Sequence, residues 1–167
     1  AIDLFHQLVA HVGNHVVVEP QPGSPFADAH PGERVVLAAA RLGAYSRELG
    51  DEPTVVATLT GADLVGRRYT PPFDYFAGHE NAHQVLAADF VTTEDGTGLV
   101  HMAPAFGEDD MATCDAAGIV PVVPVDSKGR FTAQVADYAG VQVFEANKQV
   151  IADLKAGTGP LARVDAA

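Results

Sequence analysis

The sequence predicts an α+β fold, a mixed, β-barrel-like domain of short strands with three or so packed helices. Apolar residues occur mainly in short, β-branched runs, which are typical of strands. The 16 glycines and 11 prolines of the 167 residues fall largely between these runs, where they predict turns. Because only a few segments have the composition of helices, the pattern favours this mixed fold over a doubly wound parallel sheet.

In the N-terminal half, β-branched runs alternate with breaks at proline and glycine. Residues 1–10 fit either a helical turn or a strand, because periodicity does not decide over so short a window. A loop is predicted over residues 20–32, and a capped single helical turn over residues 60–66. Strands are predicted at residues 16–18, 33–37 and 54–59, and a helix at residues 38–49.

The C-terminal half is predicted to contain a hairpin and two of the helices. Residues 85–92 and 97–102 are expected to be its strands, joined by the turn Glu94-Asp95-Gly96. The histidines before it, His79 and His83, are expected to be exposed. After the hairpin we expect a helix that ends at Gly118, an irregular edge strand at 119–125, a turn at 126–129, a strand at 130–133 and a helix at 145–155 closed by Gly157.

The most distinctive segment ends in three consecutive carboxylates. It is Gly96-Thr-Gly-Leu-Val-His-Met-Ala-Pro-Ala-Phe-Gly-Glu-Asp-Asp110. Its apolar run predicts a mostly buried strand, with Leu99 and His101 on one face. The acids fall in the first turn of the next helix, where the macrodipole stabilises them by about 0.3–1 kcal/mol. Taken alone, these acids fit an ordinary helix start, and His101 fits an ordinary core histidine bonded to the backbone.

This segment closely resembles the signature of the editing domain, connective polypeptide 1, of isoleucyl-tRNA synthetases. The valyl and leucyl relatives differ after the Thr-Gly and around the Ala-Pro. The resemblance covers residues 11–155, is densest over residues 89–130 and includes the connector Tyr69–Phe73. It implies a divergent N-terminal segment at residues 1–10, the editing domain at residues 11–157 and a C-terminal tail at residues 158–167.

The resemblance implies hydrolysis of the ester between misattached valine and tRNA(Ile), in post-transfer or pre-transfer editing. Asp110 would bind the α-ammonium group, which requires a carboxylate that stays ionised. His101 would limit the pocket so that it admits valine and excludes isoleucine, and these two are the candidate catalytic residues. Water, helped by a ribose hydroxyl, would attack the ester. The candidate substrate-binding residues are Gly98, Ala103, Pro104, Phe106, Thr92 and Thr93.

The chain departs from the family pattern near its N-terminus. The family has a threonine-rich segment, with a tryptophan and prolines, just before the strand that corresponds to residues 11–19. Residues 1–10 contain no threonine, proline or tryptophan, and the chain has no tryptophan at all. Three functions therefore stay open: an active editing hydrolase, an impaired aminoacyl-adenosine binding module of the same fold, and a structural or interaction domain whose acidic triplet only caps a helix.

The charge balance restricts the possible partners. Ten basic and 22 acidic residues give a net charge of -12, which argues against autonomous binding of nucleic acid. We expect contact with the 3′ end of valyl-tRNA, with most tRNA contacts supplied by the parent synthetase, and no binding to DNA or membranes. No apolar run approaches the ~20 residues of a membrane span, and no signal peptide is evident, so a cytoplasmic protein is expected.

The remaining sequence signals predict neither a cofactor nor a metal site. Cys114 is the only cysteine, which excludes an internal disulfide, and we expect it to pack within a helix rather than to act as a nucleophile. The Gly96-x-Gly98 pair lies inside the predicted hairpin, so it is a weak signal for nucleotide binding. ATP-dependent aminoacylation is therefore expected to belong to the parent protein.

Overall fold

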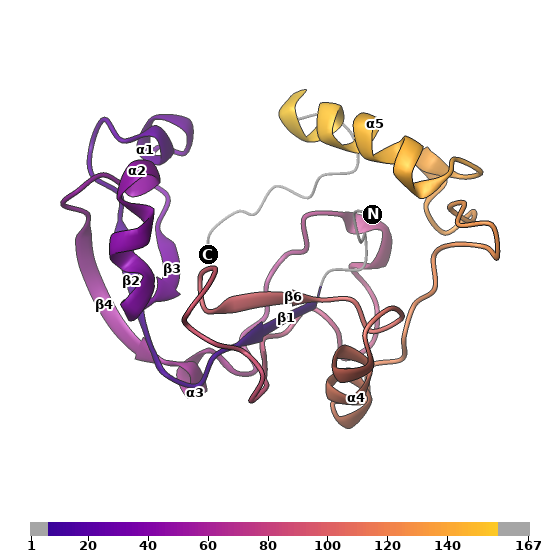
Figure 1. Ribbon diagram of the computed structural model, residues 1–167, viewed down its shortest axis with the longest axis horizontal. Coiled ribbons are helices and arrows are strands. Elements are labelled where there is room, and N and C mark those ends of the chain that lie inside the picture. Colours follow the sequence, from indigo (N-terminus) through magenta and orange to yellow (C-terminus); the bar gives the residue numbers. More distant parts are fainter. Residues whose placement is uncertain (1–6, 157–167) are drawn as a thin grey trace. The chain divides into compact units, whose positions relative to one another are not determined.

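The structure is a computed structural model that describes residues 7–156 (Figure 1). The first six residues of the predicted N-terminal segment, the predicted tail at 158–167 and Gly157 lie outside the described residues. The described chain forms two compact units. Unit 1 consists of Gln7 and residues 68–83 and 102–156, and unit 2 consists of residues 8–67 and 84–101.

Unit 2 contains a three-stranded antiparallel sheet in the order β3-β2-β4. In its register Val16 lies opposite Leu37 on one side and Thr58 on the other. All three strands fall where the β-branched runs predict them. Their bounds are Asn14–Glu19 for β2, Val35–Ala38 for β3 and Thr54–Thr60 for β4.

Short helices accompany this sheet (Figure 1). They are α1 at Pro25–Ala29, the 3₁₀ helix η1 at Ala39–Tyr45, α2 at Ser46–Leu49 and α3 at Gly61–Leu64. α1 lies inside the predicted loop, because Ser24 Oγ accepts a hydrogen bond from the Ala27 N–H group and caps it. The helix predicted at 38–49 is 3₁₀ in its first part. Val16, Val18, Leu37 and Leu49 are buried together, with Phe26, Val35, Leu42 and Tyr45 packed against them.

The second sheet has the order β5-β1-β6, with β1 at Gln7–Ala10, β5 at Leu86–Ala87 and β6 at Leu99–Met102. The predicted hairpin is therefore wrong: β1 lies between β5 and β6, and it pairs with β5 in parallel, Val9 opposite Leu86. The hairpin would have paired β5 with β6, but β1, from the start of the described chain, pairs with β5 instead. The turn at residues 94–96 exists, but it does not join paired strands.

Unit 1 is built mainly from helices and irregular segments. The helices predicted after Gly107 and at 145–155 are confirmed as α4, Glu108–Ala116, and α5, Val143–Ala156. Unit 1 also contains two short 3₁₀ helices, η2 at Asp74–Phe76 and η3 at Ala136–Tyr138. In place of the strand predicted at 130–133 there are two isolated bridges, Val125 with Phe131 and Arg130 with Gln142.

His83 contradicts its predicted exposure. It is buried, its Nε2 lies 2.7 Å from the Phe76 carbonyl oxygen, and its backbone N–H donates to Gln7 Oε1 at 3.0 Å. It lies in the interior of unit 1, where Phe73, Phe76, Met102, Cys114, Ile119, Phe131, Val135, Tyr138, Ala146 and Val150 are also buried. The histidine therefore serves packing, because its Nε2, its backbone N–H group and its carbonyl, which accepts from Tyr69 N–H, all have partners inside the protein.

Helices and two separate three-stranded sheets confirm the predicted α+β class. Among the residues that the structure describes, none of the helices combines the length and the apolar character that crossing a bilayer requires.

Candidate functional site

Asp110 is held in place by the turn that precedes its own helix. Its Oδ2 accepts a hydrogen bond from the Ala103 N–H group at 2.9 Å, so the carboxylate folds back from the first turn of α4. Gly107 leaves room for this arrangement, since a Cβ there would lie 2.8 Å from Oδ2. Within residues 7–156, Oδ1 accepts no hydrogen bond, and the side chain is partly exposed. One oxygen is fixed and the other is available to a cation.

The turn at residues 103–107 gives this carboxylate a rigid support. The Ala103 carbonyl accepts hydrogen bonds from the N–H groups of Phe106 and Gly107, at 2.8 and 3.1 Å. The Pro104 ring is fully buried, whereas the Phe106 side chain is 60% exposed. Pro104 therefore anchors the turn, and Phe106 presents an apolar ring at the surface of unit 1.

Cys114 lies one turn after Asp110 on α4 and is completely buried. Burial, together with the negative charge of Asp110, raises the pKa of the thiol to about 11. The thiol stays protonated at neutral pH and is a poor nucleophile. The prediction that Cys114 is a small packing residue is confirmed, and the described residues contain no other cysteine.

Gly98 has a conformation that favours glycine. Its φ is +77°, and a Cβ would lie 2.6 Å from Ala38 Cβ and 3.2 Å from His15 Nε2. Its carbonyl accepts a hydrogen bond from the His11 N–H group at 2.9 Å and lies 3.3 Å from His15 Nε2. The absence of a side chain therefore lets residue 98 approach β2 and β3 closely.

Arg41 fixes the turn just before Gly98. Its Nη1 donates to the Glu94 carbonyl at 2.9 Å and its Nε donates to the Gly96 carbonyl at 3.0 Å. Thr92 is exposed and Thr93 is partly exposed at the start of this segment. Sequence reasoning singled out neither Arg41 nor His15 as a support of the site. A contact with backbone carbonyls more than fifty residues away leaves no motif in the sequence.

His101 lies on β6 with its side chain exposed. The expectation of a mostly buried strand is wrong, since Val100 is 39% exposed and, of the four residues, only Met102 is fully buried. A short strand at the margin of a three-stranded sheet has less cover than its apolar sequence suggests. The alternative of a core histidine is therefore excluded, and the imidazole is accessible to a ligand.

The candidate residues divide between the two units. Asp110, Ala103, Pro104 and Phe106 belong to unit 1, and Gly98, His101, Thr92 and Thr93 belong to unit 2. In unit 1 the structure brings Asp110 and Ala103 into direct contact. Across residues 7–156, no three His, Cys, Asp or Glu side chains are arranged to hold a metal ion.

The fold is that of a CP1 domain. The solved structure of GlLeuRS-CP1 superimposes with a TM-score of 0.63 over 98% of this chain and 80% of its own, at 14% sequence identity. No protein-family model matches the chain.

Sequence similarity narrows this class to one family. The chain is 57% identical over 150 residues to isoleucine–tRNA ligase of Mycobacterium tuberculosis, and 60% identical over 151 residues to that of Mycobacterium leprae. Each match covers 89% of this chain and 14% of the relative, so the chain spans about a seventh of the relatives' length. The ligase of Rickettsia canadensis is 47% identical over 123 residues, or 72% of this chain and 11% of the relative. The chain belongs to the isoleucyl-tRNA synthetase family, which confirms the predicted CP1 editing domain of the isoleucyl type.

Proposed function

We propose that this domain hydrolyses valine from misacylated valyl-tRNA(Ile). The observation that carries the proposal is the carboxylate of Asp110, which the Ala103 N–H group holds by one oxygen while the other stays available. A fixed negative group is what binding of an aminoacyl ammonium requires. The match to isoleucine–tRNA ligase of Mycobacterium tuberculosis covers 89% of this chain. A match of that length must include the central segment from Gly96 to Asp110.

Such an activity has an energetic reason in this family. A hydrophobic pocket gains only ~1–3 kcal/mol from one methylene group, a limit for which isoleucyl-tRNA synthetases are the standard illustration. Synthesis alone therefore attaches some valine to the isoleucine tRNA. A second site that accepts valine and rejects the larger isoleucine removes the error by hydrolysis.

The two candidate catalytic residues take different roles. Asp110 binds the α-ammonium group of the valyl ester, and the exposed His101 limits the space for the amino-acid side chain. Further substrate contacts are assigned, from the resemblance, to Ala103, Pro104 and Phe106 of unit 1 and to Gly98, Thr92 and Thr93 of unit 2.

Attack by water fits the described chemistry better than a covalent intermediate. The only thiol, Cys114, is buried and stays protonated at neutral pH. A protonated, inaccessible thiol cannot attack an ester. A hydroxyl of the terminal ribose assists the water, and the 3′ end of the tRNA is the partner of the site. The expected cytoplasmic location follows from this role and stays a prediction.

A deacylation assay tests the proposal directly. Purified protein is mixed with valyl-tRNA(Ile), and release of valine is compared with release of isoleucine from isoleucyl-tRNA(Ile). We expect valine release above the buffer rate and little release of isoleucine. Equal rates for both esters would remove the proposed specificity, and no release beside an active full-length synthetase would refute the activity.

A second function is favoured by the composition of residues 1–10. They lack the threonines that the family places before the strand corresponding to residues 11–19. A domain without them could bind aminoacyl-adenosine and fail to hydrolyse it. Calorimetry with a non-hydrolysable valyl-adenosine analogue distinguishes the two: binding without deacylation supports this module, and binding that survives Asp110→Ala argues against the ammonium contact in both.

A further inference from the structure

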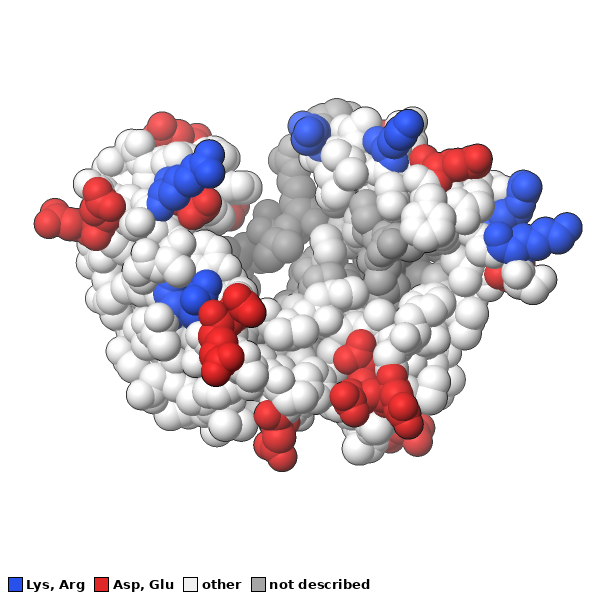
Figure 2. All heavy atoms as spheres, viewed as in Figure 1, with Lys and Arg blue, Asp and Glu red and all other residues white. Residues whose placement is uncertain are grey.

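Most of the cations of unit 1 lie in one region, on α5 and the turn before it. The first turn of α4 carries three carboxylates, Glu108, Asp109 and Asp110. Four of the five lysines and arginines among the described residues of unit 1 lie on α5 and the turn before it, together with three acidic residues. Figure 2 shows basic side chains over α5 and at the adjacent turn, with an acidic group between them. We call this region the α5 surface; it is made of Lys128, Arg130, Phe144, Lys148, Ile151 and Lys155.

The exposed face of α5 combines lysines with large apolar side chains. Phe144, Lys148, Ile151 and Lys155 follow each other at spacings of four, three and four, which places them on one face of a helix. Phe144 is 67% exposed and Ile151 is 45% exposed. The opposite face packs inward through Ala146 and Val150, which are buried. The exposed face is therefore not the face that holds α5 to its unit.

The lysines on this face are not joined to carboxylates by salt bridges within the part of the chain that the structure describes. Asp153 accepts hydrogen bonds from Tyr138 Oη at 2.7 Å and from Gln149 Nε2 at 2.8 Å. Glu145 lies three residues before Lys148 and is the acidic neighbour on this side of the helix. Within residues 7–156, neither Lys148 nor Lys155 makes an ion pair. Of the acidic residues on α5, Glu145 alone has no hydrogen bond within that range.

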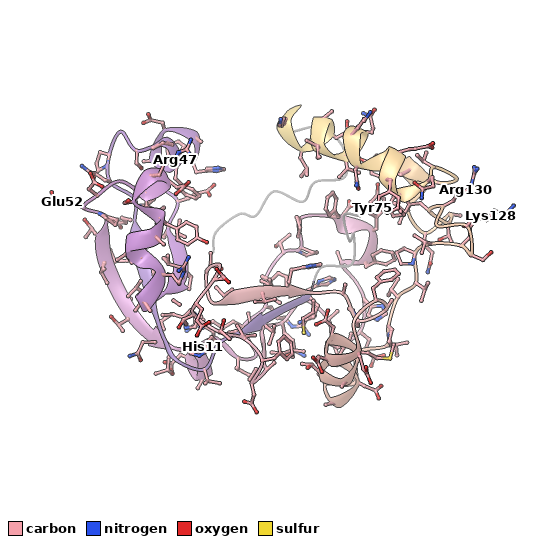
Figure 3. All side chains as sticks on the ribbon, viewed as in Figure 1. His11, Arg47, Glu52, Tyr75, Lys128 and Arg130 are labelled. Carbon is pink, nitrogen blue, oxygen red and sulfur yellow. The ribbon has the colours of Figure 1, made fainter. Side chains whose placement is uncertain are left out.

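The turn at residues 126–130 adds two cations beside the start of α5. The Gly129 carbonyl accepts a hydrogen bond from the Val143 N–H group at 3.0 Å, which joins the turn to the helix. Asp126 accepts hydrogen bonds from the N–H groups of Lys128 and Arg130, at 2.8 and 2.9 Å, and so fixes the turn. Figure 3 shows the Lys128 and Arg130 side chains extending outward.

We propose that the α5 surface binds the sugar–phosphate backbone of the tRNA whose 3′ end the domain edits. The proposal rests on the proposed function. α5 has 14 residues and is therefore about 21 Å long, so its lysines and the cations of the adjacent turn can meet several phosphates in succession. The exposed Phe144 ring supplies a surface on which an unpaired base can stack. Since the chain has a net charge of -12, binding of a polyanion requires a local group of cations, and this surface supplies four.

Binding of labelled tRNA(Ile), followed by fluorescence anisotropy between about 50 and 200 mM salt, tests the surface. If all four cations contact phosphates, raising the salt over this range should weaken wild-type binding by roughly 100-fold. Lys148→Gln should reduce the slope of log K against log salt by about 0.9 for a duplex contact. Arg47→Gln, an exposed charge on α2 that also lacks an ion pair within residues 7–156, should leave the slope unchanged.

Two further variants test whether negative charge on α5 weakens tRNA binding and whether a base stacks on Phe144. Glu145→Gln removes a negative charge from the same helix, so it should strengthen binding at low salt. Phe144→Ala should weaken binding by at least about fivefold without changing the salt slope, because stacking is not ionic. Equal slopes for Lys148→Gln and Arg47→Gln would overturn the proposal. So would the absence of wild-type binding at about 50 mM salt, the low end of the range.

Two controls separate this proposal from the proposed function. A short valyl-adenosine ester, which has no tRNA backbone, should be hydrolysed equally by wild type and Lys148→Gln. If valyl-tRNA is hydrolysed but Lys148→Gln leaves its KM unchanged, the surface is refuted and the editing function stands. If no ester is hydrolysed and the tRNA binding still depends on Lys148, the editing function fails and the surface stands. Binding to phosphatidylserine vesicles that depends on Lys148, without binding to tRNA, would assign the surface to a membrane and refute it as a tRNA contact.

Discussion

Replacing Asp110 by asparagine separates the charge of this side chain from its role as a hydrogen-bond acceptor. The amide oxygen can still accept the Ala103 N–H, which Oδ2 now accepts at 2.9 Å. A bond to a charged acceptor contributes about 1.5–3 kcal/mol and a neutral one about 0.5–1.5 kcal/mol, so the free energy of unfolding should fall by only about 1 kcal/mol. Because Asp110 is partly exposed and water screens its charge, about 1 kcal/mol is an upper value for this loss of stability.

The effect on editing should be larger than the effect on stability. Losing the charged contact with the substrate ammonium removes about 1.5–3 kcal/mol of transition-state binding, which lowers kcat/KM for valyl-tRNA(Ile) roughly 10- to 150-fold. The assay is initial-rate deacylation at subsaturating substrate. Asp110→Ala should reduce activity similarly and stability further, because the Ala103 N–H then loses its partner at a cost of about 1–3 kcal/mol.

A readout inside α4 shows whether the charge was removed as intended. The negative charge of Asp110 helps to raise the pKa of the Cys114 thiol to about 11, so this pKa should fall in Asp110→Asn while burial keeps it above its ordinary value. Thiolate absorbance measured against pH reports the change. Full editing activity in Asp110→Asn, with the thiol pKa lowered, would refute the ammonium contact. An unchanged stability in Asp110→Ala would refute the structural role of the bond to Ala103.

The other predictions concern the supports of the site. Gly98→Ala should lower the free energy of unfolding by about 2–4 kcal/mol, because residue 98 has a positive φ and the new methyl group would be overpacked. Gly96→Ala should lower it by only about 1–2 kcal/mol, because a Cβ there has open space. Equal losses for the two variants in denaturant titrations would contradict this prediction. Burial and hydrogen bonds to carboxylates raise the pKa of Tyr75 and of Tyr138. Above pH ~10, the pKa of tyrosine in the unfolded chain, the unfolded chain releases these two protons while the folded protein keeps them. The stability that the two tyrosines contribute is therefore complete below that pH and should be lost as the pH rises above it. If the protein with both tyrosines replaced by phenylalanine were equally sensitive to alkaline pH, the assignment would be disproved. Cys114 should not react with thiol reagents at neutral pH until the protein unfolds, which mass spectrometry of the labelled chain checks.

The start of α4 could be predicted because its determinants are local. Gly107 breaks the preceding segment, three acids follow it, and the helix begins at Glu108. The acids favour the positive end of the helix whatever the rest of the chain does. The bond from Ala103 to Asp110 is also short in sequence, but it depends on how the turn at residues 103–107 closes, which composition does not specify.

The arrangement of the strands could not be predicted in the same way. The turn near Gly96 has the glycine and the positive φ that a tight turn needs. A hairpin nevertheless requires the flanking strands to pair with each other, and here Val9 and Ala10 of β1 occupy the edge of β5. Strand pairing is decided by competition among all available edges, so a correct local turn did not imply the correct partner. The misjudged exposure of Val100 and His101 has the same origin, because burial depends on what covers a strand.

The segment from Gly96 to Asp110 is therefore only part of what makes the site. Gly98 is fixed by His11 and His15, and the turn before it by Arg41, through bonds to backbone carbonyls that any residue type could offer. These supporting residues lie 53 to 87 positions away in sequence, and none of them belongs to the recognisable motif. A relative could keep every residue of the motif and still lose its geometry by changing Arg41. The proposed editing function therefore requires the distant supports His11, His15 and Arg41 as well as the proposed contacts of Asp110 and His101.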